Sequence, residues 1–383
     1  MRKRSVVAAI AALVLAGCTE ELNAPSDEGF ASDAAFGVGG GAPGTVFAMT
    51  NAAAGNEVWA FGRSANGTLS SPAVYSTGGD GSGAGLGSQG ALVLSEAHRW
   101  LLAVNAGSDE VSVFSVGAGG LTLTDVEGSG GDMPISVTLN GSIVYVLNAG
   151  GAGNIAGFRL GHNGHLSPIA GSTRPLSGAG TGPAQIEFSP DGSVLVVTEK
   201  NTNRILTYTV NAQGLASGPA VHVSAGMTPF GFAFARRSFL LVSEAFGGAV
   251  NASATSSYRL GAGGTLQTIS ASVATTETAA CWTVVTNNSR FAYVTNTGSG
   301  TVTGYAVGND GHLTVLDADG VTGETGMGSA PTDADFSSSS KFLYVLNSGN
   351  GSIAIFAVAA NGSLATVPGV SGLPSSATGL AAH

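Results

Sequence analysis

A pattern that recurs seven times along the chain is the strongest constraint on its fold. Each copy has an apolar run ending in Asn or Glu, a Gly-rich turn, a second run with one aromatic residue, and a Gly turn before a Leu. The residues that end the first run, called anchors below, are Asn51, Asn105, Asn148, Glu199, Glu244, Asn296 and Asn347. Their mean spacing of about 49 residues is typical of propeller blades.

The segments around the anchors predict a meander of antiparallel strands in every copy. The runs before them, such as IVYVL and FLYVL, are apolar throughout, which indicates strands buried on both faces. One aromatic residue follows each anchor, nine or ten residues later except for fourteen in the fifth copy, which is a regularity that core packing requires: Phe61, Phe114, Phe158, Tyr208, Tyr258, Tyr305 and Phe356. A Gly then ends each hairpin turn, where it supplies positive φ: Gly67, Gly120, Gly164, Gly214, Gly264, Gly311 and Gly362.

The innermost strand of each blade is expected just before the apolar run. The candidates are Gln89–Leu94, Pro134–Leu139, Pro183–Phe188, Pro229–Phe234, Cys281–Val285 and Pro331–Phe336. These are six strands for seven copies, and the first copy has none before it. We expect the seventh in Pro374–His383, where it would complete the first blade and leave no open edge. The prediction is an all-β, seven-bladed propeller with four-stranded antiparallel blades over residues 44–383, closed by the C-terminal strand.

Composition agrees with this fold and excludes some partners. The chain has 60 Gly in 383 residues and only 10% charged residues, which favours many turns and short strands. Its net charge is −10 at pH 7. An acidic chain with scattered Lys and Arg is a poor partner for nucleic acid.

The N-terminus predicts export and a lipid anchor. Three basic residues precede the apolar run Val6–Leu15, which is too short to span a bilayer. The segment Leu15–Cys18 then resembles the lipobox of bacterial lipoproteins. We therefore expect a signal peptide over residues 1–17, a lipid on Cys18, and a flexible tether over 18–43. The alternative is an ordinary secretory signal with an incidental Cys.

If Cys18 carries a lipid, the protein is held on a membrane of the bacterial cell envelope. Thr19 follows the cysteine in place of Asp, which favours the outer membrane in a two-membrane bacterium, with the protein on the cell surface or on the periplasmic side.

The repeats resemble the lactonase family of seven-bladed β-propellers, which includes 6-phosphogluconolactonase-like proteins and fungal carboxymuconate cyclases. The resemblance rests on SPDGSVLVVTE (Ser189–Glu199), KFLYVLN (Lys341–Asn347) and NDGHLT (Asn309–Thr314), and it covers about residues 44–383. It implies a site at the top of the ring, where the inner strands begin and the second strands end. It also implies lactone hydrolysis or cycloisomerisation.

The residues that the family uses for catalysis are not matched. The family has Gly-Pro-Arg-His at the start of an inner strand, and this chain has Gly182-Pro183-Ala184-Gln185. The family's Asn-Glu after the next strand is Glu199-Lys200 here, so the acid stands one position early. The resemblance thus implies the family's fold with its catalytic Arg and His replaced.

Other polar residues are predicted to gather at the top face. Arg174, Lys200 and Arg204 could together anchor a carboxylate or phosphate in place of the lost Arg; the alternative is that they are solvated turn charges. Glu199 or Glu244 could act as a base. The remaining candidates for ligand binding are Gln185, Glu187, Trp282 and Asp333. For Trp282, packing is the competing interpretation. No Asp-x-Asp-x-Asp loop occurs, so we expect no metal and no cofactor.

Two functions follow as hypotheses. The first is a lipid-anchored binding or scaffold propeller that recognises a small acid, a glycan or a protein at its top face. The second is a lactone hydrolase or cycloisomerase, with Glu199 or Glu244 as base and Arg174 or Lys200 as substrate anchor.

Overall fold

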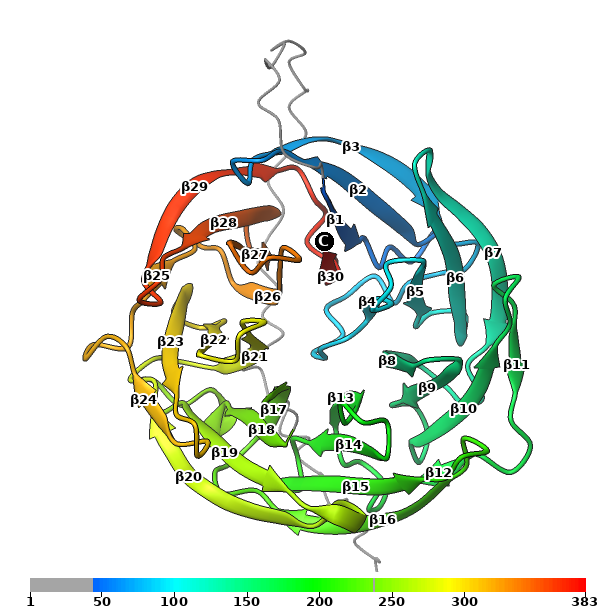
Figure 1. Ribbon diagram of the computed structural model, residues 1–383. Coiled ribbons are helices and arrows are strands. Elements are labelled where there is room, and N and C mark those ends of the chain that lie inside the picture. Colours follow the sequence, from blue (N-terminus) through cyan, green and yellow to red (C-terminus); the bar gives the residue numbers. More distant parts are fainter. Residues whose placement is uncertain (1–43, 237) are drawn as a thin grey trace, which may run out of the picture.

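A computed structural model describes residues 44–236 and 238–383 of the chain. The predicted signal peptide, Cys18 and the tether lie outside these residues. The fold is an all-β ring of seven sheets (Figure 1), with only two short 3-10 turns, η1 (Phe246–Gly248) and η2 (Ala262–Gly264), in the described part. We call the middle of the ring, which the innermost strands surround, the channel. The seven-bladed propeller predicted from the repeats is therefore confirmed. We number its blades 1 to 7 along the chain.

Each blade is an antiparallel sheet whose strands run from the channel to the rim. The innermost strands of blades 1 to 7 are β30 (Thr378–Ala382), β4 (Leu92–Leu94), β8 (Pro134–Asn140), β13 (Pro183–Phe188), β17 (Pro229–Ala235), β21 (Ala280–Val285) and β26 (Pro331–Phe336). The second strands are β1 (Gly44–Met49), β5 (Trp100–Asn105), β9 (Ile143–Asn148), β14 (Val194–Glu199), β18 (Phe239–Glu244), β22 (Phe291–Asn296) and β27 (Phe342–Asn347).

The outer half of each blade completes the sheet. The third strands are β2 (Glu57–Arg63), β6 (Glu110–Gly117), β10 (Asn154–Leu160), β15 (Arg204–Val210), β19 (Ala254–Leu260), β23 (Thr301–Val307) and β28 (Ser352–Val358). The outer strands are β3 (Leu69–Ser76), β7 (Gly120–Gly128), β11 (Leu166–Pro168) with β12 (Arg174–Pro175), β16 (Ala216–Val223), β20 (Leu266–Ala274), β24 (Leu313–Val315) with β25 (Gly323–Glu324), and β29 (Leu364–Ser371). The outer strand is thus interrupted in blades 3 and 6.

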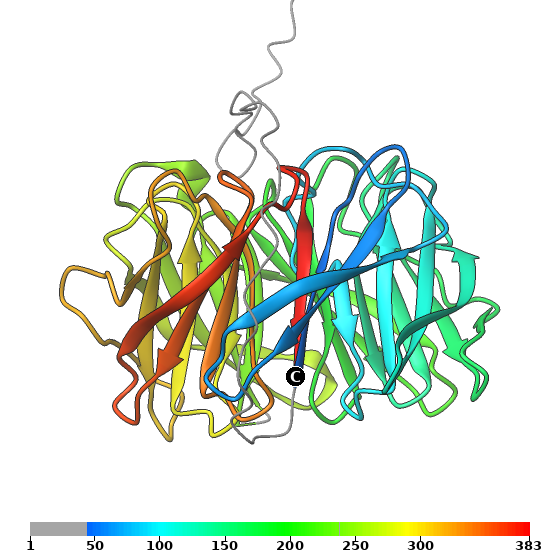
Figure 2. The ribbon, with the colours of Figure 1, turned by 90° about the horizontal axis from the view of Figure 1, so that it is seen from above.

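The C-terminal strand closes the ring as predicted. Strand β30 pairs antiparallel with β1, with Phe47 opposite Ala381 and Ala48 opposite Leu380. Thr45 and His383 exchange both backbone hydrogen bonds, at 3.2 and 2.9 Å. Figure 2 shows β30 running from the top of the ring, where the blades are connected, to the bottom. Blade 1 is therefore built from both ends of the described chain, and no radial edge is left unpaired.

The repeat positions have the roles that the sequence predicts. All seven anchors have no exposed surface, and the seven aromatic residues of the third strands are at most 2% exposed. The seven turn glycines have φ between +81° and +102°, where a side chain would be strained. The sheets therefore pack face to face through apolar strands, with the anchors at the top edge of each second strand.

Blade 2 differs from the prediction at its inner strand. We expected Gln89–Leu94, but the strand covers only Leu92–Leu94. The residues before it leave the blade and extend into the channel (Figure 1). The strand is short because its first half has other hydrogen-bond partners, which are described next.

Candidate functional site

The upper end of the channel, where the family resemblance places the site, is occupied by the segment Leu86–Gly90 of the chain itself. We call this segment the plug. It belongs to the connection from blade 1 to blade 2, and Leu86, Ser88 and Gln89 are each at most 9% exposed. Its burial requires that its backbone polar groups find partners inside the channel.

The plug is bonded to blades 3 and 4 on one side of the channel. The Ser88 hydroxyl donates to the Ile135 carbonyl at 2.8 Å, and the Val137 amide donates to the Gly90 carbonyl at 2.8 Å. The Gln89 amide donates to the Ala184 carbonyl at 3.0 Å. Main-chain groups of β8 and β13 that would otherwise face the channel are therefore paired with the plug.

On the other side the plug is bonded to blade 6. The Gln89 side chain makes a two-way contact with the backbone of Thr283: its Nε2 donates to the carbonyl at 2.8 Å and its Oε1 accepts from the amide at 3.0 Å. The indole Nε1 of Trp282 donates to the Ser88 carbonyl at 3.0 Å. The plug thus crosses the ring from blade 2 to blade 6.

Blade 5 makes room for this crossing with Gly231. A Cβ built on Gly231 would lie 2.1 Å from Gln89 Oε1 and 2.6 Å from the Cys281 carbonyl oxygen. Real Cβ atoms do not approach other heavy atoms so closely, so a side chain here would displace either the plug or β21. The glycine is therefore explained by the plug.

Lys200, one of the predicted ligand anchors, points at the plug. Its Nζ donates to the Gly87 carbonyl at 2.5 Å and lies 4.8 Å from the centre of the Phe230 ring. Burial lowers its pKa from 10.5 to about 8, because desolvation disfavours the ammonium form. The Phe230 ring also lies 5.0 Å from that of Trp282. Lys200 and Trp282 are thus brought together, and both donate to the plug.

Glu199, a predicted base, lies at the top end of β14 with no exposed surface. Its carboxylate accepts from the amide and hydroxyl of Ser177, at 2.9 and 2.5 Å, and from the Thr202 hydroxyl at 2.6 Å. These donors fix the connection from blade 3 onto blade 4. Three of the about four acceptor positions of this carboxylate are thus engaged, and its complete burial keeps it away from a water molecule that it would have to deprotonate.

Glu244, the other predicted base, has the same place in blade 5. Its carboxylate accepts from the Gly226 amide at 2.7 Å and from the hydroxyls of Ser256 and Ser272 at 2.5 and 2.7 Å. Burial raises its pKa, and the three hydrogen bonds oppose this rise. Asn148, the anchor of blade 3, reaches the preceding connection in a similar way, through the Ser129 carbonyl at 3.2 Å.

The other two predicted anchors lie apart from Lys200. Arg174 is on the outer strand β12, and its Nη1 donates to the carbonyls of Gly171 and Thr173 at 2.8 and 2.7 Å. Arg204 begins the third strand of blade 4 and is exposed. No ion pair or hydrogen bond joins these three side chains in the described part of the chain. The structure therefore does not assemble them into one anion site.

Gln185 joins two neighbouring inner strands. It accepts from the Phe232 amide at 2.7 Å and donates to the Phe232 carbonyl at 3.0 Å. Its Nε2 also donates to Glu187 at 2.9 Å. Burial raises the pKa of Glu187 from 4.5 to about 8, although the bond from Gln185 lowers it. Glu187 lies in the channel wall below the plug.

Asp333 and Asp335 hold the closing strand. Asp333 accepts from the Leu380 amide at 3.0 Å, and Asp335 accepts from the Ala382 amide at 2.9 Å. Burial raises both pKa values, that of Asp335 to about 6 and that of Asp333 well above its usual range. The predicted ligand group Asp333 is therefore engaged in joining blade 7 to blade 1.

The sequence analysis did not predict the plug, although two features of the sequence indicate a segment packed inside the ring. The connection from blade 1 to blade 2 has Gly or Ser at most positions from Thr77 to Gly90, as a backbone packed closely against other strands requires. Gly231 is a glycine where the inner strands of blades 3, 4, 6 and 7 carry side chains. Neither signal states which strands the segment contacts, because the partners lie up to 194 residues away.

Across residues 44–236 and 238–383, no three His, Cys, Asp or Glu side chains are grouped in a way that could hold a metal ion. The same residues contain no helix long and apolar enough to cross a membrane.

Known proteins of similar structure share the ring. A Lactobacillus plantarum protein of solved structure is 17% identical, with a TM-score of 0.73 and coverage of 89% of this chain and 99% of its own. A periplasmic gluconolactonase from Pseudomonas aeruginosa is 16% identical (TM-score 0.72, 89% and 99% covered). A putative 6-phosphogluconolactonase from Bacteroides fragilis is 19% identical (TM-score 0.67, 89% and 98% covered). At these identities the likeness shows the fold alone.

A search of curated protein sequences finds no match. The family model described as "Lactonase, 7-bladed beta-propeller" matches residues 54–173 and 172–371, which is most of the chain and nearly all of the ring. With its seven closed blades and this match, the chain belongs to the lactonase family of seven-bladed β-propellers.

Proposed function

We propose that this protein is a non-hydrolytic lactonase-family propeller that works as a binding or scaffold module for a small acid, a glycan or a protein at its top face. The observation that carries the proposal is the plug. A lactone would need to reach the upper end of the channel, and the plug holds that space through bonds to blades 3, 4 and 6. The ligand would then contact the loops around the plug.

The two carboxylates that could serve as bases support the same proposal. Hydrolysis needs a base with a free lone pair within reach of a water molecule. Glu199 and Glu244 are fully buried, and each accepts three hydrogen bonds from connections and strands of the ring. They serve as structural acceptors at the top edge, where anchors such as Asn148 and Asn347 instead donate through Nδ2.

We also propose that the protein is anchored in the bacterial envelope through a lipid on Cys18. The proposal rests on the basic residues, apolar run and lipobox-like Leu15–Cys18 of the N-terminus. Labelled palmitate should be incorporated into the full chain and not into a Cys18→Ser variant. Equal labelling of both proteins would exclude the anchor.

The alternative is that the protein opens lactones as an enzyme. Family membership favours it, as do the names of two structural neighbours, a periplasmic gluconolactonase and a putative 6-phosphogluconolactonase. Glu199 or Glu244 would act as base and Lys200 or Arg174 as substrate anchor. For this the plug would have to leave the channel and one carboxylate would have to lose a donor.

A lactone-opening assay separates the two. The full chain is mixed with glucono-1,5-lactone and with its 6-phosphate, and acid release is followed against buffer, with and without EDTA. We expect no saturable rate above buffer. Saturable hydrolysis that Glu199→Gln or Glu244→Gln abolishes, in variants whose melting temperature shows that they are folded, would establish the enzyme instead.

A further inference from the structure

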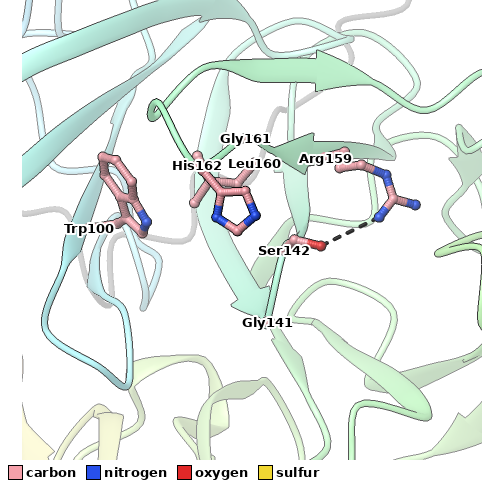
Figure 3. A pocket seen from close by; sticks show the side chains of 7 residues that line it. All are labelled: Trp100, Gly141, Ser142, Arg159, Leu160, Gly161 and His162. Carbon is pink, nitrogen blue, oxygen red and sulfur yellow. Dashed lines mark hydrogen bonds between the residues drawn. The ribbon is translucent and has the colours of Figure 1, made fainter.

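A hollow on the bottom face, between blades 2 and 3, has a lining that the top-face site does not share (Figure 3). It encloses about 490 Å³, in the range of small-molecule sites. Its lining comes from the start of β5, the turn from β8 to β9, the end of β10 and the turn after it: Trp100, Gly141, Ser142, Arg159, Leu160, Gly161 and His162. Gly141, Ser142 and Gly161 are small and Leu160 is apolar, so the polar chemistry of the hollow depends mainly on the side chains of Trp100, Arg159 and His162.

The large side chains offer hydrogen-bond donors that the protein does not use fully. In Figure 3 the indole nitrogen of Trp100 is turned toward His162, and no acceptor for it exists among the described residues. Arg159 is exposed and makes two long contacts, to Ser142 Oγ at 3.4 Å and to the Gln213 carbonyl at 3.3 Å. The His162 ring is exposed and is bonded to no described group.

No carboxylate balances this cluster. The lining has no Asp or Glu, in a chain whose net charge is −10. The acid nearest along the adjoining strand, Asp125, accepts from His165 Nδ1 at 3.2 Å and from the Leu166 amide at 2.7 Å. Within the described part of the chain, no Lys or Arg side chain lies within 4.0 Å of a carboxylate, and the contact of Asp125 with His165 is an ion pair only when the imidazole is protonated. Arg159 thus keeps its charge available for a ligand.

Arg99 contacts both Trp100 and His162, which line the hollow. The guanidinium carbon of Arg99 lies 4.9 Å from the centre of the Trp100 ring, and its Nη2 donates to the His162 carbonyl at 3.0 Å. Arg99 therefore joins the two sides of the hollow. A rigid indole beside a cation fits a ligand with an apolar ring face and an acidic group, as an uronic acid has.

We propose that this hollow binds the uronic acid residues of an acidic glycan. The sugar ring packs on Trp100, whose indole N–H donates to a ring hydroxyl, and the carboxylate accepts from the Arg159 guanidinium, with His162 as a further donor. The inference does not depend on the proposed function, because the hollow lies on the opposite face from the plug.

Blade 5 provides a matched control within the same chain. Arg259 stands near the end of its third strand, as Arg159 does in blade 3. Its guanidinium carbon lies 4.8 Å from the centre of the Phe239 ring, so it covers an aromatic residue of its own blade. Arg259 carries the same charge at the matching position, but its guanidinium lies over Phe239 and it does not line the hollow.

The test is calorimetric titration of the full chain at low ionic strength. The probes are trigalacturonate, galactotriose and acetate, which separate the sugar from its charge. We expect saturable binding of trigalacturonate, about tenfold weaker or undetectable binding of the other two, and a loss of about tenfold or more in Arg159→Ala and in Trp100→Ala. Arg259→Ala should bind within about twofold of the wild type.

Three results would overturn the proposal. They are absence of saturable trigalacturonate binding to folded protein, equal affinity for galactotriose or acetate, and an Arg259→Ala loss as large as that of Arg159→Ala. An Arg159→Lys variant with intermediate affinity would support the bidentate contact to a carboxylate. Lactone hydrolysis by the wild type would leave this result unchanged, so the two proposals can fail separately.

Discussion

At the top of the channel, Lys200, Trp282 and Gln89 direct their donors at carbonyl groups of the chain itself. At the bottom hollow, the donors of Trp100 and His162 have no partner among the described residues, and Arg159 makes only two long contacts. Buried donors must be paired to avoid a desolvation cost, whereas exposed donors are paired by water until a ligand replaces it. The donors inside the channel therefore contribute stability, whereas those of the bottom hollow are available to a ligand.

The largest effect is expected from Gly231→Val. The new side chain would meet Gln89 Oε1 and the Cys281 carbonyl, so the plug must leave or β21 must shift. We expect a loss of about 3 kcal/mol in the free energy of unfolding, measured by chemical denaturation. The Gln89 amide should also exchange its hydrogen faster.

Gly85→Val is the control for this change. Gly85 lies in the same connection, and a Cβ there meets nothing within 4 Å. A loss in Gly85→Val equal to that in Gly231→Val would mean that the plug is not responsible.

A smaller effect is expected from Gln89→Ala. The change leaves the buried amide and carbonyl of Thr283 without the Gln89 side chain, which should cost about 2 kcal/mol. Gln213→Ala, at an exposed position, should change stability by less than about 0.5 kcal/mol. If both variants unfold at the same denaturant concentration, the contact across the ring does not stabilise the fold.

The channel wall below the plug should give a pH dependence. The folded-state pKa of Glu187 is raised from 4.5 to about 8, so its neutral form favours folding, and this contribution is lost as pH rises through that window. Glu187→Gln keeps an acceptor for Gln185 and cannot ionise. Its melting temperature should exceed that of the wild type at pH 8.5 and match it near pH 4.5. If the melting temperatures of the wild type and Glu187→Gln differ by the same amount at every pH from about 4.5 to 8.5, the pKa of Glu187 is not raised by burial.

The smallest effect is expected at the hollow. Arg159→Ala should change the free energy of unfolding by less than about 0.5 kcal/mol, because its contacts are long and exposed. Thermal melting in the absence of glycan is sufficient to measure this. A loss comparable to that of Gln89→Ala would mean that Arg159 is structural and would remove the contrast between the faces.

The sequence predicts the ring well because the ring depends on local patterns. Apolar runs, one aromatic residue and a turn glycine recur in each copy, and each feature decides the structure of its own few residues. The closing strand could also be predicted, since six inner strands for seven copies leave one place for Pro374–His383. The observed strand, Thr378–Ala382, lies inside that range.

The site could be predicted less well because it depends on contacts between distant blades. Glu199 and Glu244 stand at the expected edge, but their hydrogen bonds show which way the carboxylates face, and no pattern in the sequence contains that information. Arg174 is close to Lys200 in number, yet β12 carries it to the rim. The plug and the hollow each combine residues from several repeats, so neither appears in an alignment of the copies.

The crossing from blade 2 to blade 6 has a mechanical consequence. A propeller without such a crossing can widen or flex as neighbouring blades slide past one another. Here Gln89 joins the connection before blade 2 to Thr283 of blade 6, so a force that displaces one of these blades also acts on the other. If the two ends of the chain are pulled apart, the seam between β30 and β1 carries the load first. It would open by peeling while the braced remainder keeps its shape.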